Sequence, residues 1–212
     1  MIAESVYIDF LNNLVEGNKR NCSLIVNNLL NCGTDVKEIY MDLIQKSMYR
    51  IGQMWDRHKI SIAQEHIASQ IIENLLSQIY PRVVQENRNS KSVVIACLDK
   101  EFHEIGARMV SDYFELNGWH SLFLGANTPN EDLIDIVKIR RPDVVGISIN
   151  FYINVCRLTK LLDEITRKFP DQKIILGGQA INENHIELIN KFHNVTYLTC
   201  LNALEEYIKD FY

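Results

Sequence analysis

The segment DKEFHEIG, residues 99–106, carries the side chains best suited to metal chemistry. The neutral imidazole of His103 is a good ligand for a borderline transition metal. Glu101, two residues earlier, could accept the other ring N–H of that imidazole and so select its tautomer. A lone histidine in a loop is more often a surface or hydrogen-bonding residue, so this pair indicates a metal site only together with other features.

Small and polar residues elsewhere could complete a crevice for a long, flat ligand. Gly106 allows the helix that follows DKEFHEIG to begin close to a bulky group. Ser148 and Asn150 stand in the tripeptide SIN, at the end of an apolar run. Gly177 and Gly178 follow another apolar run and remove two side chains there. A glycine pair after a strand is usually only a turn, so each of these signals is weak by itself.

The second half of the chain alternates short β-branched runs with helical stretches of about 17–23 residues, a length that suits right-handed crossovers in a parallel sheet. The runs are SVVIACL (92–98), HSLFLG (120–125), DVVGISI (143–149), KIIL (173–176) and VTYL (195–198). We predict that residues 87–212 form a doubly wound, Rossmann-like (flavodoxin-like) α/β domain with a five-stranded parallel sheet.

This fold brings the candidate residues to one edge. In the flavodoxin-like strand order 2-1-3-4-5, the first, third and fourth strands are neighbours, and ligands bind beyond the carboxyl ends of the strands. The candidate residues follow those three strands. We therefore expect one crevice to be lined by Glu101, His103, Gly106, Ser148, Gly177 and Gly178.

Residues 1–86 contain no convincing strand and are predicted to form a four-helix bundle cap. Apolar residues recur there at helical spacing, and Gly17 is expected to stop a helix. Ser61 and Gln64 have the spacing of a capping box at the start of the last helix. The polar segment 82–92 is interpreted as a linker between the bundle and the α/β domain.

The motif EFHEIG resembles the DxHxxG motif of cobalamin-binding (B12-binding) domains, with Glu101 in place of the aspartate. The SIN and GG elements follow in an order and spacing that resemble the SxL and GG elements of this family, although Asn150 stands where the family more often has an apolar residue or Thr. The resemblance implies that His103 replaces dimethylbenzimidazole as the lower axial cobalt ligand. It also implies that the displaced nucleotide tail lies near Ser148 and the two glycines.

The segment GQMWDRHKISIAQEH, residues 52–66, resembles the W-x9-EH signature of light-sensing adenosylcobalamin regulators of the CarH type. The resemblance implies that Trp55 packs over the upper cobalt face and that Glu65 hydrogen-bonds the adenosyl group. It implies that His66 becomes the upper axial cobalt ligand after light breaks the cobalt–carbon bond. Ile62, one turn before His66, would also contact the adenosyl group.

Two functions fit these features, and neither requires the chain itself to be an enzyme. The main hypothesis is an adenosylcobalamin-dependent light sensor and regulator, in which we expect no room for the DNA-binding winged helix of CarH-type repressors, so that the signal would pass to a protein partner. The alternative is a methylcobalamin-dependent corrinoid carrier subunit of a methyltransferase system. The Glu65–His66 pair speaks against the alternative, because a second imidazole above cobalt would obstruct methyl transfer. A cobalamin store is a weaker third interpretation.

Composition excludes several other classes. The net charge of −5 offers no basic footprint, so direct nucleic-acid binding is not indicated. No apolar run reaches the ~18 residues of a membrane span, and the N-terminus lacks the pattern of a signal peptide. Five cysteines without a CxxC pair suit a reducing compartment. We expect a cytoplasmic protein whose bundle surface could support a homo-oligomer.

Overall fold

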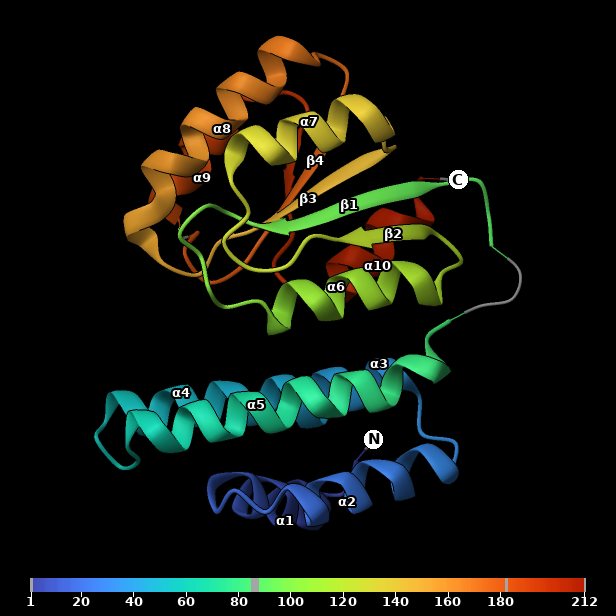
Figure 1. Cartoon of the computed structure of the whole chain (residues 1–212), viewed down its shortest axis with the longest axis vertical. Helices are drawn as coiled ribbons and strands as arrows, with labels where there is room; N and C mark the ends of the chain where they lie inside the picture. The colour runs from blue at the N-terminus through green and yellow to red at the C-terminus, as the bar shows by residue number, and fades with distance from the viewer. Residues whose placement is uncertain (1, 85–87, 182, 212) are drawn as a thin grey trace. The chain divides into compact units, whose positions relative to one another are not determined.

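The computed structural model of the protein describes residues 2–84, 88–181 and 183–211. The chain divides into two compact units, Met1–Val83 and Val84–Tyr212, which are drawn in Figure 1 and described one at a time below. All five cysteines are free thiols, as their scattered positions predicted. In the described part of the chain, no helix has the length and apolar character needed to cross a membrane.

The first unit is built from helices alone. In chain order the elements are α1 (Glu4–Val15), α2 (Lys19–Asn31), α3 (Val36–Glu38), the π-helical segment η1 (Ile39–Gln45), α4 (Lys46–Asp56), α5 (Ile62–Ile79) and the 3-10 turn η2 (Tyr80–Arg82). Because α3, η1 and α4 follow one another without a break, they make a single long helix with a widened middle. This helix lies beside α5, as Figure 1 shows, and α1 packs against both α2 and α5.

Local sequence signals set the helix boundaries in this unit. Gly17 adopts a φ of +75° after α1, a left-handed conformation that glycine takes without strain. The capping box predicted at Ser61 is complete: its hydroxyl accepts the N–H of Gln64, and the Gln64 side chain accepts the N–H of Ser61. The apolar faces of the helices bury a core that includes Phe10, Leu14, Tyr40, Leu43, Ile51, Ile72 and Leu76.

The second unit is the predicted doubly wound α/β domain. Its strands are β1 (Ser92–Cys97), β2 (His120–Phe123), β3 (Val144–Ser148), β4 (Lys173–Gly177) and β5 (Val195–Tyr197). They are parallel and run in the order β2-β1-β3-β4-β5, which confirms the flavodoxin-like prediction. The helices are α6 (Ile105–Leu116), α7 (Asn130–Arg140), α8 (Val155–Lys168), α9 (Glu183–Ile189) and α10 (Leu201–Lys209), and the 3-10 turn η3 (Tyr152–Asn154) precedes α8.

Helices cover both faces of the sheet. In Figure 1, α7 and α8 lie on one face, and α6 and α10 lie on the other. The central β-branched runs are buried for this reason: β3 is buried along its whole length, and it packs with α7 and α8 in one apolar core. Two-sided burial explains why these strands are nearly continuous apolar runs in the sequence.

The strand register places three strand ends at the same level. Cys97 at the end of β1 pairs with Ser148 at the end of β3, and Ser148 pairs in turn with Gly177 at the end of β4. The loops that follow these three strands therefore emerge side by side at the carboxyl edge of the sheet. This is the edge at which ligands of open parallel sheets bind.

The capping box at Ser61 yields a first prediction. Ser61→Ala leaves the N–H of Gln64 without its side-chain acceptor, so we expect the free energy of unfolding of the helical unit to fall by about 1 kcal/mol. Urea denaturation followed by circular dichroism measures this loss. Ser61→Asp keeps an acceptor oxygen at the cap and should retain most of the stability. An equal loss in both variants would contradict a capping role.

Candidate functional site

The side chain of Glu101 lies at the centre of the site on the carboxyl edge of the sheet. It is fully buried, and its carboxylate accepts hydrogen bonds from two loops. Oε1 lies 3.2 Å from Nδ1 of His103, which is the contact that the sequence predicted. Oε2 accepts the backbone N–H groups of Asn150, at 2.8 Å, and Phe151, at 3.1 Å. The carboxylate thus ties the loop after β1 to the loop after β3.

These contacts determine the charge of Glu101. Burial by itself raises the pKa of the carboxyl, but hydrogen bonds from the His103 ring and from the N–H groups of Asn150 and Phe151 outweigh it and leave the pKa below its ordinary value. The group is therefore an anionic acceptor at neutral pH. An anion beside Nδ1 favours the tautomer with the proton on that nitrogen, which leaves the lone pair of Nε2 available to a ligand.

The imidazole of His103 is hydrogen-bonded on one side, through Nδ1, and exposed on the other. Its side chain is 56% exposed, although its partner Glu101 is completely buried. The ring of Phe151 packs edge-on against it, with 4.8 Å between ring centroids and 74° between planes. The backbone carbonyl of His103 accepts a hydrogen bond from Nδ2 of Asn150 at 3.2 Å. The ring orientation is consequently constrained while one side remains open to a ligand.

Asn150, one of the two residues that depart from the family pattern, connects the loops of the site. Its backbone N–H reaches Glu101 and its carboxamide donates to the carbonyl of His103. The same carboxamide lies 3.5 Å from the hydroxyl of the buried Ser148 and accepts the N–H of Gln179 at 3.3 Å. An apolar residue could form only the first of these four contacts, so the polar side chain joins the loops after β1, β3 and β4.

The three candidate glycines have different physical roles. A Cβ added to Gly106 or Gly177 would meet no heavy atom within 4 Å, so these positions leave open space beside the site. Gly178 differs from the prediction that both glycines of the pair make room for a ligand. Its φ is +109°, and a Cβ there would overlap the carbonyl oxygen of Ile149. Gly178 is required by the approach of its own backbone to the loop after β3.

The residues present fit a cofactor that brings most of its own metal ligands. Within the described ranges, no group of three or more His, Cys, Asp and Glu side chains could hold a metal ion. A cofactor that carries its own metal ligands would complete the coordination of a metal held by His103. A macrocycle such as a corrin does this, and the open space at Gly106 and Gly177 lies along the same edge.

The second set of candidate residues lies where α4 ends and α5 begins. Trp55, the penultimate residue of α4, is 47% exposed, and Ile62, the first residue of α5, is 55% exposed. Nε2 of His66 lies 3.7 Å from Oε2 of Glu65, whose other oxygen accepts the hydroxyl of Ser69 at 2.9 Å. These four candidates thus share one end of the helical unit, with two large apolar side chains open to a ligand.

Two residues that were not singled out from the sequence also hold the loop around His103. Oε2 of Glu104 accepts the N–H of Ala126 at 2.8 Å, and Oδ1 of Asn127 accepts the N–H of Lys100 at 2.9 Å. Both contacts attach this loop to the one between β2 and α7. A sequence signal existed for Asn127, because asparagine in a Gly- and Pro-flanked turn tolerates left-handed backbone.

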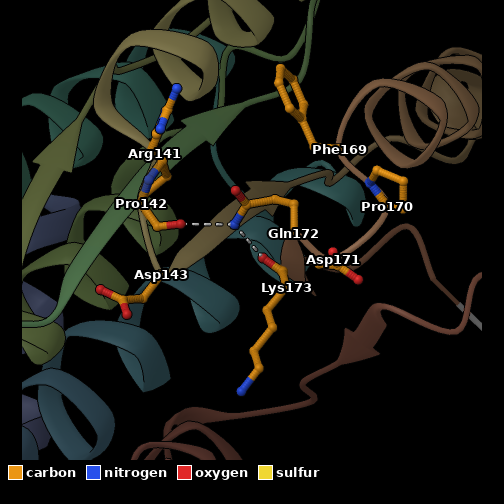
Figure 2. A pocket seen from close by; sticks show the side chains of 8 residues that line it. All are labelled: Arg141, Pro142, Asp143, Phe169, Pro170, Asp171, Gln172 and Lys173. Carbon is orange, nitrogen blue, oxygen red and sulfur yellow. Dashed lines mark hydrogen bonds between the residues drawn. The ribbon is translucent and has the colours of Figure 1, made fainter.

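A hollow of about 440 Å³ lies at the opposite edge of the sheet. Figure 2 shows its lining side chains, which come from the segments that enter β3 and β4: Arg141, Pro142, Asp143, Phe169, Pro170, Asp171, Gln172 and Lys173. Gln172 bridges the two segments by donating to the carbonyl of Pro142 at 3.1 Å. Because it adjoins the amino ends of these strands, this hollow is distinct from the site of His103.

The fold and the site define a cofactor-binding α/β domain preceded by a helical unit, with an imidazole offered at the carboxyl edge of the sheet. A family model of the B12 binding domain matches residues 91–195, and a second model with the same description matches residues 8–80. The chain therefore belongs to the B12-binding domain proteins, and it is a cobalamin-binding protein. The two matched regions contain both sets of candidate residues.

Relatives with similar sequences include two repressors of Myxococcus xanthus. The HTH-type transcriptional repressor CarA is 27% identical over 131 residues, which cover 62% of this chain and 45% of CarA. The HTH-type transcriptional repressor CarH is 32% identical over 99 residues, which cover 46% of this chain and 32% of CarH. The chain thus spans less than half the length of either repressor.

A solved structure shares the architecture of the whole chain. The monomethylamine corrinoid protein of Methanosarcina barkeri superimposes with a TM-score of 0.81, and 95% of each chain is covered. The sequence identity is 16%, so the likeness is one of fold.

The glycine pair yields a second prediction. Gly178→Ala forces a side chain into left-handed backbone and against the carbonyl of Ile149, and the strain should lower the free energy of unfolding by about 1–3 kcal/mol. Gly177→Ala, with open space around the added methyl group, is the matched control and should be near wild type in the cofactor-free protein. Chemical denaturation of both variants makes the comparison. Equal stabilities would contradict the close approach seen at Gly178.

The buried carboxylate yields a third prediction. Glu101→Gln replaces one acceptor oxygen by an NH2 group that must face either the backbone N–H of His103 or the N–H groups of Asn150 and Phe151. An unmatched buried donor should cost about 1–3 kcal/mol of unfolding free energy, measured by urea denaturation. Glu104→Gln is the control, since the remaining oxygen can still accept the N–H of Ala126. A loss that is no larger for Glu101→Gln than for this control would refute the assignment.

Proposed function

We propose that this protein is a cobalamin-dependent methyl carrier that serves a methyltransferase partner, with His103 as the lower axial cobalt ligand. The observation that carries the proposal is the Glu101–His103 pair at the carboxyl edge of a fold that matches a corrinoid protein along its whole length. The name of that protein assigns it to monomethylamine metabolism. For this chain, we propose only that it is a methyl carrier, and we name no methyl donor.

Bound cobalamin would supply a cobalt atom that accepts and releases a methyl group. The part of this chain is to hold that atom from below. Nε2 of His103 would ligate it, while Glu101 accepts a hydrogen bond from the N–H at Nδ1 and keeps the ring turned in one direction. Since Glu101 is itself fixed by two backbone N–H groups, the imidazole would keep its orientation whether or not it is bound to the metal.

The neighbouring residues suit the remainder of the cofactor. Ser148 and Asn150 present polar groups at the end of β3, and Gly177 leaves room for an extended chain beside them. Gly106 allows the first turn of α6 to approach a bulky group. We assign the nucleotide tail to this slot, with the corrin ring above His103.

An adenosylcobalamin light sensor is the second candidate, and a specific set of residues favours it. Trp55, Ile62, Glu65 and His66 occur with the spacing of CarH-type regulators, and CarA and CarH are 27% and 32% identical to the matched regions. The Glu65 carboxylate lies 3.7 Å from Nε2 of His66, whose side chain is 69% exposed, so this weak contact could be exchanged for a metal. A sensor of this kind would signal through a partner protein or through a change of oligomeric state.

The fourth prediction concerns the bound cofactor. Purified protein loaded with methylcobalamin should hold it through dialysis. Anaerobic photolysis, which splits the cobalt–carbon bond into cob(II)alamin and a methyl radical, should then give an electron paramagnetic resonance spectrum split by one imidazole nitrogen. With 15N-histidine protein, the triplet splitting should become a doublet. His103→Ala should abolish this splitting, whereas His185→Ala, a control in α9, should preserve it. A spectrum indifferent to His103→Ala would eliminate the proposed ligand.

Upper-face chemistry separates the two functions in the same preparation. For a methyl carrier, the fully reduced protein should be remethylated by methyl iodide, at similar rates in wild type and His66→Ala. For a light sensor, green illumination of the adenosylcobalamin complex should give a photoproduct whose absorption spectrum changes in His66→Ala. A photoproduct that depends on His66 would replace the methyl-carrier proposal by the sensor.

A further inference from the structure

Two residues with left-handed backbone meet beside the candidate site. Among the described residues, non-glycine positions with positive φ include Lys100, at +65°, and Asn127, at +50°. Lys100 lies in the loop after β1, one residue before Glu101, and Asn127 lies in the loop between β2 and α7. Positive φ at non-glycine positions is strained and persists only where surrounding contacts impose it. The contacts between these two loops therefore identify what holds the strained segment.

Asn127 forms two hydrogen bonds with the dipeptide Lys100–Glu101, one at each end. Its side-chain Oδ1 accepts the N–H of Lys100 at 2.9 Å, and its backbone N–H donates to the carbonyl of Glu101 at 2.7 Å. The neighbouring Thr128 extends the attachment, because its N–H donates to the carbonyl of Cys97 at 3.2 Å. The loop after β2 thus fixes the backbone at the start of the loop that carries His103.

We propose that Asn127 is a positioning residue for the axial ligand: its carboxamide holds Lys100 in left-handed backbone and thereby aims Glu101 at His103. The inference rests on the proposed ligation of cobalt by His103 and adds a residue that would act through Glu101. Asparagine suits the position for two reasons. It tolerates left-handed backbone better than most residues, and its oxygen replaces the backbone acceptor that a tight turn would otherwise provide.

The role follows from the geometry of Glu101. Its carboxylate must reach His103 with one oxygen and the N–H groups of Asn150 and Phe151 with the other. A rotation at Lys100 would move the Cα atom of Glu101. It would break either the contact with His103 or the hydrogen bonds from Asn150 and Phe151. The fully buried side chain has no solvent to compensate for such a loss. A displaced carboxylate would leave the imidazole without its fixed tautomer and weaken its bond to the metal.

Three substitutions at position 127 separate the side chain from the backbone. Asn127→Gly permits left-handed backbone without strain but lacks the acceptor. Asn127→Ala lacks the acceptor and also resists this conformation. Asn127→Asp keeps an oxygen at the same distance. Each variant is loaded with cobalamin as the full chain, and the histidine-ligated fraction is measured from the 15N-histidine splitting of the cob(II)alamin spectrum. Amide hydrogen exchange of Lys100 in cofactor-free protein reports the anchor directly.

We expect Asn127→Gly to reduce the ratio of histidine-ligated to histidine-free cofactor on the order of threefold, less than the 10–100-fold typical of direct partners of a ligand. Asn127→Ala should reduce it further, and Asn127→Asp should restore it. The Lys100 amide should exchange faster in the Gly and Ala variants, while thermal denaturation shows that both remain folded.

The outcomes distinguish the inference from the function on which it rests. An unchanged ligated fraction in Asn127→Gly, in a protein whose splitting disappears in His103→Ala, would overturn the positioning role alone. A wild-type protein without histidine splitting would overturn the ligation by His103 and the inference together. Faster exchange at Lys100 with a normal ligated fraction would also overturn the inference, because the anchor would then have no effect on the ligand.

Discussion

The site depends on a buried negative charge. Glu101 is fully buried, and burying an ionised carboxylate is unfavourable unless hydrogen-bond donors surround it. The N–H groups of Asn150 and Phe151 and the His103 ring provide this compensation. Loops after different strands must therefore keep a fixed separation for the charge to be tolerated. That requirement fixes the imidazole of His103 in place, since its acceptor is set by the protein alone.

The parallel sheet satisfies this requirement through its register. Cys97, Ser148 and Gly177 end three adjacent strands at one level, so the loops that follow begin within reach of one another. Asn150 then links these loops through its carboxamide, and Gly178 permits the backbone after β4 to approach Ile149. The rigid sheet fixes where the loops begin, and the loops carry the functional side chains, as is usual in doubly wound domains.

The same lower site can serve a carrier or a sensor, and the helical unit distinguishes them. A carrier needs an upper face that a small methyl group can reach, whereas a sensor needs a side chain that responds when the upper ligand is lost. Trp55 and Ile62 expose apolar surface suitable for either cofactor form. The two functions differ in their use of His66: a sensor would exchange its weak 3.7 Å contact with Glu65 for cobalt, whereas a carrier would not use this imidazole.

Short-range patterns in the sequence determined the strands, the capping box at Ser61 and the Glu101–His103 contact, because each depends on residues that are neighbours in the chain. The strand order also followed from general rules for parallel sheets, which limit how crossovers can be made. Only the tertiary structure revealed the bonds of Asn127 to Lys100 and of Phe151 to Glu101, which join residues far apart in sequence. It also corrected the interpretation of Gly178. The sequence cannot distinguish a glycine that leaves space for a ligand from one whose backbone closely approaches another part of the chain. Packing decides between such cases, because close approach depends on chain segments that no local pattern brings together.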